Sequence, residues 1–109
     1  MAFRTKKNDV GEIVIYPQGV LDLTVSPNLR TELLALAGDG NKKIVVDLSD
    51  VEVIDSSCLG ALIDGLKEAH KNGGELRISG LSDQVASMIQ LSRLDGILKV
   101  VDPPSPLIE

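Results

Sequence analysis

The 109-residue sequence has very few of the residues that serve redox chemistry, metal binding or base stacking. Cys58 is the only cysteine, so an intrachain disulfide cannot form and a metal cluster held by several thiolates is excluded. His70 is the only histidine, and without a second one we expect no metal site and no cofactor. Phe3 and Tyr16 are the only aromatic residues. The core must therefore be aliphatic, and platforms for stacking nucleic-acid bases are missing.

Positive charge is also scarce. Eleven Lys and Arg residues stand against sixteen Asp and Glu residues, which gives a formal charge of −5 and a pI near 4.8. A phosphodiester backbone repels such a protein, so direct nucleic-acid binding is not expected. The sequence has no long uninterrupted apolar run and no basic-then-apolar signal pattern. We therefore expect no membrane insertion and a cytoplasmic location.

The length predicts a single domain over residues 1–109, because a chain of this size can bury one core without disulfides or metals. No repeat, linker or low-complexity segment divides it. We expect the core to span about residues 3–101. The tail, residues 102–109, carries three prolines, which cannot supply regular helix or ladder hydrogen bonds. The tail is expected to fray and to be dispensable for folding.

Apolar periodicity predicts short strands that alternate with helices. The first predicted elements are a hairpin of residues 3–7 and 12–17 and a helix that is capped by Ser26 before Pro27 and ended by Gly38 and Gly40. A strand over 44–48 follows, then a helix with an apolar stripe at Leu59, Leu62, Ile63 and Leu66, and a strand over 75–79. The last elements are a helix capped at Ser82-Asp83, with a stripe at Val85, Met88, Ile89 and Leu91, and a strand over 97–101. Such alternation implies an α/β fold: a small mixed sheet with an N-terminal hairpin and later parallel strands.

The segment with the most chemical content is 55–60, Asp-Ser-Ser-Cys-Leu-Gly. It lies where the apolar strand has given way to a helical pattern, which places Ser56 and Ser57 at a helix N-terminus. There the first backbone N–H groups lack partners within the helix, and the helix dipole favours negative charge. A serine at this place can cap the helix, attack an electrophile or hold a phosphate.

An enzymatic role for these serines is disfavoured by the residues around them. His70 follows Ser56 by fourteen positions in the same predicted helix, about 20 Å away at roughly 1.5 Å per residue, so no histidine base is in reach. A Ser-Lys pair stays open, although no G-x-S-x-G or S-x-x-K spacing is present. Gly60, Gly65 and Lys67 do not make a phosphate-binding loop, because they lie inside the helical pattern. We expect both glycines to be close-packing positions. For Ser56, capping and phosphorylation remain.

Residues 45–60, Val-Val-Asp-Leu-Ser-Asp-Val-Glu-Val-Ile-Asp-Ser-Ser-Cys-Leu-Gly, resemble the signature of STAS domains. Three further segments resemble the same family in order: 19–22 after its second strand, 72–76 at a helix-to-strand turn, and 92–98 leading into its last strand. The match involves nearly the whole chain, which looks like a stand-alone bacterial anti-sigma factor antagonist. The resemblance implies a single STAS-like domain with helices packed mainly on one face of the sheet.

In this family the serine directly after the aspartate is phosphorylated, and that position is Ser56 here. The resemblance implies that a serine kinase, which doubles as the anti-sigma factor, modifies Ser56 and that a metal-dependent phosphatase reverses the change. The unmodified form would bind the kinase and displace the sigma factor. Such a protein is not an enzyme, and we expect a monomer when it is free. The alternative is a STAS subunit that never switches, such as the small component of an ABC-type lipid transport complex.

The implied acceptor surface places four residues around the phosphorylation site: Asp22, Asp55, Ser57 and Cys58. Ser57 is expected to make local hydrogen bonds in the first helical turn. Cys58 stands where the family usually has glycine, and the proline-rich tail stands where the family usually has an amphipathic helix. The candidate partner contacts lie on the same helix, at Gly60, Asp64 and Lys67. Asp64 and Lys67 are spaced as an i,i+3 ion pair on a solvated flank.

Overall fold

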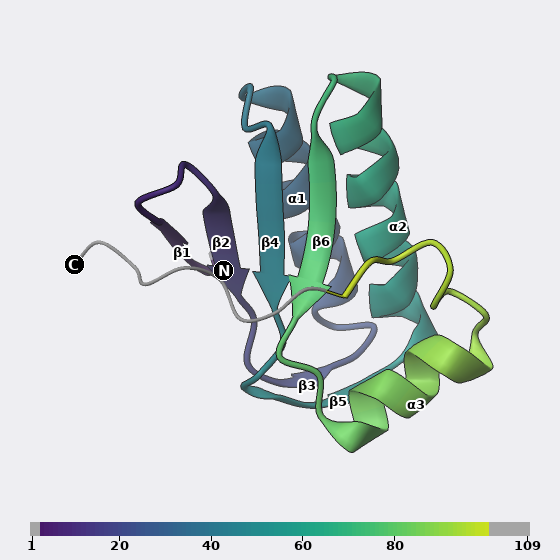
Figure 1. Ribbon diagram of the computed structural model, residues 1–109. Helices are drawn as coiled ribbons and strands as arrows, with labels where there is room; N and C mark the ends of the chain where they lie inside the picture. Colours follow the sequence, from purple (N-terminus) through teal and green to yellow (C-terminus); the bar gives the residue numbers. More distant parts are fainter. Residues whose placement is uncertain (1–2, 101–109) are drawn as a thin grey trace.

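Two β-sheets and three helices form the described part of the chain, residues 3–100 of the computed structural model (Figure 1). The elements are β1 (Arg4–Lys7), β2 (Ile13–Tyr16), β3 (Gly19–Leu21), α1 (Ser26–Gly38), β4 (Lys43–Asp47), β5 (Val51–Ile54), α2 (Ser56–Lys71), β6 (Glu75–Ser79) and α3 (Asp83–Leu91). None of these helices has the length and apolar character needed to cross a membrane. The predicted tail, residues 102–109, lies outside the described residues.

The larger sheet has the strand order β1-β2-β4-β6. β1 and β2 are antiparallel, with Arg4 opposite Tyr16, whereas β4 is parallel to both of its neighbours. The predicted hairpin and the predicted parallel strands are therefore confirmed. The helices α1 and α2 lie side by side against one face of this sheet, also as expected (Figure 1).

The core lies between the larger sheet and these two helices and is aliphatic, as the scarcity of aromatic residues predicts. β4 is buried from Ile44 to Asp47, as befits a strand between two neighbours. Gly65 allows α2 to approach α1, because a Cβ at this position would lie 2.9 Å from the Cβ of Leu33. The close-packing prediction is thus confirmed for Gly65. It is wrong for Gly60, which is exposed and would have no atom within 4 Å of a Cβ.

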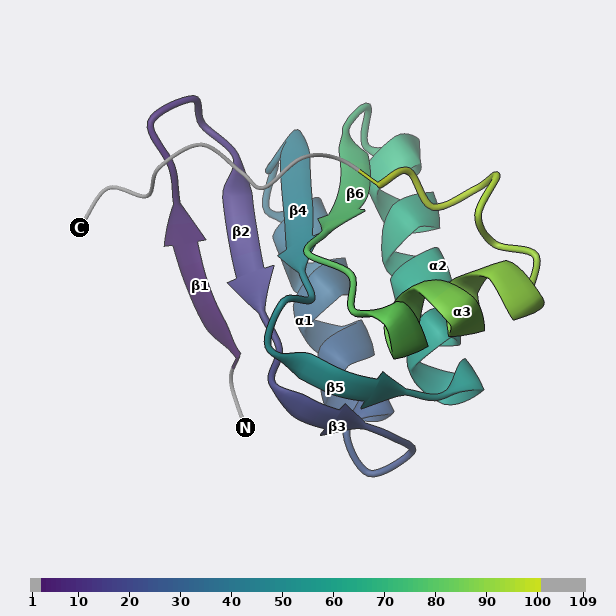
Figure 2. The same ribbon diagram turned by 60° about the horizontal axis from the view of Figure 1, so that its bottom comes forward.

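A second sheet pairs β3 with β5 in parallel at one end of the larger sheet (Figure 2). The sequence pattern predicts neither strand. They contain only three and four residues and show neither an apolar run nor a regular alternation. In β5, moreover, Glu52 and Val53 are both exposed between buried Val51 and Ile54, so the polar and apolar residues do not alternate.

The predicted cap of α3 is confirmed, and that of α1 is wrong. Ser82 precedes α3, and its hydroxyl oxygen accepts the backbone N–H of Val85 at 3.3 Å. Ser26, by contrast, is already the first residue of α1, and Val25 holds the cap position. The reason is a turn that starts earlier, since the N–H groups of Val25 and Ser26 both donate to the carbonyl of Asp22.

Two predictions near the C-terminal end of the described chain are also wrong. The strand expected over 97–101 is reduced, in its described part, to a single parallel bridge between Val100 and β6. A turn replaces it, because the N–H of Leu98 donates to the carbonyl of Leu94 and leaves fewer groups for a ladder. Leu91, expected in the apolar stripe of α3, is 80% exposed because the helix ends there.

Gly65→Ala should destabilise the protein, although alanine is the better helix former. The added Cβ must displace Leu33, an overpacking cost of about 1 to 3 kcal/mol. Gly60→Ala is the matched control: it places a Cβ in open space and should stabilise α2 by up to about 1 kcal/mol. Urea unfolding of both variants measures the difference. Equal stabilities would show that the contact between α1 and α2 relaxes without cost.

Candidate functional site

The candidate site lies where β3 and β5 end, beside the first turn of α2 (Figure 2). The backbone N–H of Asp55 donates to the carbonyl of Leu21 at 3.0 Å, which ties the ends of the two strands together. Because the carboxyl ends of parallel strands meet at one edge of a sheet, the residues that follow them, Asp22 and Asp55, become neighbours. The structure thus brings together two acidic residues that are far apart in the sequence.

Asp55 caps α2. Its backbone is extended, and its carboxylate accepts the N–H of Cys58 at 3.2 Å and the hydroxyl of Ser57 at 2.6 Å. Capping by Ser56 is therefore wrong, because the residue before it already holds the cap position. The Ser57 hydroxyl, helped by the N–H groups of Cys58, Ser57 and Leu23, lowers the pKa of the Asp55 carboxyl although partial burial opposes this. The carboxylate is consequently charged at neutral pH.

The two serines have different surroundings. Ser57 is half-buried, and its hydroxyl donates to Asp55, the local bond expected in the first turn. Ser56 is exposed at the first position of α2, and within residues 3–100 its hydroxyl has no hydrogen-bond partner. Only the Ser56 hydroxyl is therefore free to take up a group from solution.

Cys58 lies beneath the acceptor surface and not on it, contrary to the expectation from the sequence. Its side chain is fully buried because the third position of α2 points into the core, where the thiol approaches the carbonyl of Asp22 at 3.4 Å. Burial, reinforced by the charges of Asp55 and Asp22 and opposed by the Ser57 hydroxyl, raises the pKa of the thiol to about 11. The thiol is thus protonated at neutral pH.

Two of the three candidate partner contacts line a groove of about 360 Å³ between α1 and α2. Gly60 and Asp64 share this groove with Ser57, whereas Lys67 is exposed one turn further along α2. Asp64 forms its ion pair with Arg30 of α1, at 2.9 Å, so the expected pair with Lys67 is wrong. Since both paired side chains are about half exposed, this ion pair contributes little to stability.

A family model described as "Mlab, STAS domain" matches residues 5–102. The chain belongs to the STAS domain family. An anti-sigma-B factor antagonist of Staphylococcus aureus is 33% identical to this STAS domain over 82 residues, which are 75% of this chain and 76% of that protein. One of Bacillus subtilis is 29% identical over 94 residues, 86% of this chain and 85% of that protein. These homologues are regulatory proteins.

Solved structures support the same assignment. A crystal structure from Thermotoga maritima, described as a "putative anti-sigma factor antagonist", matches with a TM-score of 0.83 at 27% identity, covering 94% of this chain and 86% of that one. The antagonist SpoIIAA in its unphosphorylated form shares the fold, with a TM-score of 0.80 at 21% identity over 95% of this chain and 90% of that one. The predicted STAS fold is therefore confirmed.

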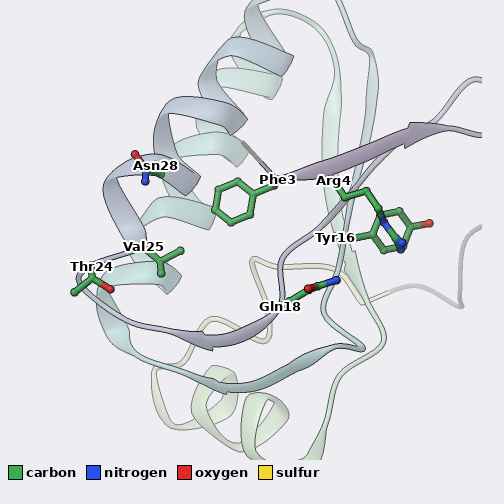
Figure 3. A pocket seen from close by; sticks show the side chains of 7 residues that line it. All are labelled: Phe3, Arg4, Tyr16, Gln18, Thr24, Val25 and Asn28. Atoms are coloured by element: carbon green, nitrogen blue, oxygen red, sulfur yellow. The ribbon is translucent and has the colours of Figure 1, made fainter. Parts of the chain in front are cut away.

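The STAS domain also has a hollow of about 420 Å³ between the hairpin and the first turn of α1 (Figure 3). It is lined by Phe3, Arg4, Tyr16, Gln18, Thr24, Val25 and Asn28. The ring of Phe3 points toward α1, whereas the guanidinium of Arg4 stacks on Tyr16, 4.5 Å from the ring centroid. The lining comes from separate segments, so no sequence motif marks it, and it contains none of the predicted site residues.

Asp55→Ala should cost about 1 kcal/mol of stability at neutral pH, the usual loss for a helix cap. Because the folded-state pKa of Asp55 lies below the ordinary value of 3.8, the charged cap stabilises the protein fully above that value. This contribution falls as the pH drops through the folded-state pKa. Urea unfolding should therefore show that the difference in unfolding free energy between wild type and Asp55→Ala shrinks below about pH 4. A difference that is constant down to about pH 2 would contradict the lowered pKa.

Cys58 should not react with thiol reagents while the protein is folded, because the thiol is buried and protonated. A colorimetric disulfide reagent at neutral pH should label it only after addition of denaturant. The control is Ser56→Cys, which adds a thiol at an exposed position of the same helical turn and should give one rapidly labelled thiol per chain. Rapid labelling of native wild type would instead identify a reactive cysteine.

Proposed function

We propose that this STAS protein is an anti-sigma factor antagonist that works by partner switching. The unphosphorylated form binds a serine kinase that doubles as the anti-sigma factor, and the sigma factor is displaced. Transfer of the terminal phosphoryl group of ATP to the Ser56 hydroxyl ends this binding, and a metal-dependent phosphatase restores it by hydrolysis. Asp22, Asp55 and Ser57 shape the acceptor surface, and Gly60, Asp64 and Lys67 supply partner contacts.

The observation that carries this proposal is the difference between the two serine hydroxyls. The Ser57 hydroxyl is held by the carboxylate of Asp55 at 2.6 Å, and modification would break that bond. The Ser56 hydroxyl is exposed and unpartnered within residues 3–100, so phosphate can be added without disturbing the cap of α2. This favours Ser56 as the acceptor independently of its place in the family motif.

A phosphate on Ser56 would change the surface more than the fold. It adds roughly −1.5 to −2 charges and three acceptor oxygens. The N–H of Cys58, a donor that an anion at a helix N-terminus would use, is already bonded to Asp55. The phosphate must therefore project toward solvent beside Asp55, and the surface becomes strongly anionic while the core is unchanged. A binary choice of partner needs only a few kcal/mol of such differential affinity.

The relatives favour this function over a transporter subunit. Curated homologues that match three quarters or more of the chain are anti-sigma-B factor antagonists. Affinity purification from the native host distinguishes the two functions, because a switching antagonist should recover a kinase and a phosphatase. Recovery of transporter subunits in their place would support the alternative.

Ser56→Ala should fold normally and bind the kinase but take no phosphate. Its stability should change by less than about 0.5 kcal/mol, because the exposed hydroxyl does not cap the helix. Ser57→Ala should still be phosphorylated, although it loses the bond to Asp55. Ser56→Asp should weaken kinase binding only in part, since one carboxylate carries less charge than a phosphate.

The assay incubates wild type and the two alanine variants with the cognate kinase and ATP and follows the mass shift. A mass shift that survives in Ser56→Ala and disappears in Ser57→Ala would show that the acceptor is Ser57 and that the proposal names the wrong serine. Wild type that accepts no phosphate from any kinase of its host would remove the switching mechanism and leave the transporter-subunit alternative.

A further inference from the structure

Three of the exposed apolar side chains gather beside the acceptor serine. Within residues 3–100 the exposed large apolar residues are Val10, Val20, Leu23, Val53, Leu91, Ile97 and Val100. Val20, Leu23 and Val53, which are 50%, 71% and 40% exposed, all lie at the small sheet and the loop that follows it. We name these three residues the apolar patch.

The pairing of β3 with β5 explains why two of these residues are neighbours. Val20 is directly opposite Val53 in the parallel register, and paired residues point to the same face of a sheet. The residues that follow them, Leu21 and Ile54, are buried in the core. Val20 and Val53 therefore form an apolar pair on the outer face of the small sheet.

Leu23 lies in the loop that directly follows β3, and the candidate site fixes this loop. The backbone N–H of Leu23 points to the carboxylate of Asp55, and the carboxylate of Asp22 accepts the N–H of Thr24 at 3.0 Å. The loop between β3 and α1 is thereby fixed beside the start of α2 (Figure 2). The apolar patch and the Ser56 hydroxyl consequently share one end of the molecule.

Folding does not account for the apolar patch. Its side chains are outside the buried core, and a polar residue would serve equally well on the solvent face of a two-stranded sheet. Single exposed apolar residues are ordinary, but neighbouring ones in a polar surround mark interaction sites.

The charges around the apolar patch limit the kind of partner that fits it. Asp22, Asp55 and the exposed Glu52 adjoin the patch. Moreover, no Lys or Arg occurs in residues 8–29 or 44–66, the two segments that carry the patch and the acceptor serine. A complementary surface is therefore apolar at its centre and basic at its rim.

We propose that the apolar patch is the docking surface for the kinase that phosphorylates Ser56, a proposal that rests on the function proposed above. The kinase presents apolar side chains to Val20, Leu23 and Val53 and basic side chains to the acidic rim. This surface lies on the strand side of the acceptor, separate from the groove between α1 and α2. Phosphate on Ser56 then places a strongly hydrated group at the edge of a contact that must lose its water, and binding ends because the cost of removing that water exceeds the attraction to the basic rim.

The test measures the affinity of the unmodified protein for the cognate kinase by calorimetry. Leu23→Ser and the double variant Val20→Thr/Val53→Thr should each raise Kd about tenfold or more. The matched controls are Leu91→Ser and Val10→Thr, which make the same changes at exposed positions at the end of α3 and in the turn between β1 and β2, and they should stay within about twofold of wild type. Circular dichroism and urea unfolding verify that each variant is folded. If Val20→Thr/Val53→Thr is unstable, Leu23→Ser, which lies in a loop, is sufficient for the test.

Phosphorylation kinetics and oligomeric state separate the two proposals. Variants of the apolar patch should raise the KM for the protein substrate, leave the rate at saturation unchanged and still be phosphorylated on Ser56. If wild type is phosphorylated but the patch variants bind like the controls, docking through the patch is wrong and the proposed function stands. If wild type forms dimers that these variants dissociate, without loss of kinase binding, the patch is a self-association surface. If wild type takes no phosphate, both proposals fail.

Discussion

The carboxylate of Asp55 organises the end of the molecule where the candidate site lies. It caps α2 through the N–H of Cys58, holds the Ser57 hydroxyl and attracts the N–H of Leu23 from the loop after β3. A single charged group thus joins the start of a helix to a loop from another part of the chain. Because the carboxylate accepts all of these donors, the Ser56 hydroxyl makes no hydrogen bond to the described part of the chain, residues 3–100.

Separate residues hold the start of α2 and carry the exposed hydroxyl, and this separation suits a switch that acts on binding. The residues that maintain the helix start, Asp55 and Ser57, are bonded to each other, and Cys58 is packed beneath them. Ser56 stands outside this arrangement, so its modification changes charge at the surface without removing a hydrogen bond from the fold. The proposed docking patch adjoins Asp22 and Asp55, so a phosphate on Ser56 would add a strongly hydrated charge to a surface that is already acidic.

Sequence patterns predict the larger sheet well because its strands carry local signals: a turn between β1 and β2, and apolar runs in β2 and β4. The hairpin, the buried β4 and the Ser82 cap all follow from local residue preferences. The small sheet does not, since β3 and β5 have three and four residues and are specified by pairing between distant segments. The contact between Arg30 and Asp64 is missed for the same reason, because helix spacing points only to neighbours within α2.

The site is partly predictable, and its ambiguities have a physical origin. Aspartate and serine are both good helix caps, so Asp55-Ser56 alone does not say which one holds the N–H groups. The extended backbone at Asp55 decides it, and that conformation follows from pairing with Leu21 across the small sheet. The proximity of Asp22 has the same cause. Ser56 as the phosphate acceptor, and the partner contacts at Gly60, Asp64 and Lys67, stay predictions.

The most direct test of the central claim compares Ser56-phosphorylated and unmodified protein in two measurements on the same samples. Calorimetry with the cognate kinase should show Kd raised about a hundredfold or more by the phosphate, equivalent to about 3 kcal/mol. Amide NMR spectra should show shifts confined to the start of α2 and the loop after β3, with the core signals unchanged. Equal affinities of the two forms, or shifts spread through the core, would contradict a switch that changes the surface and preserves the fold.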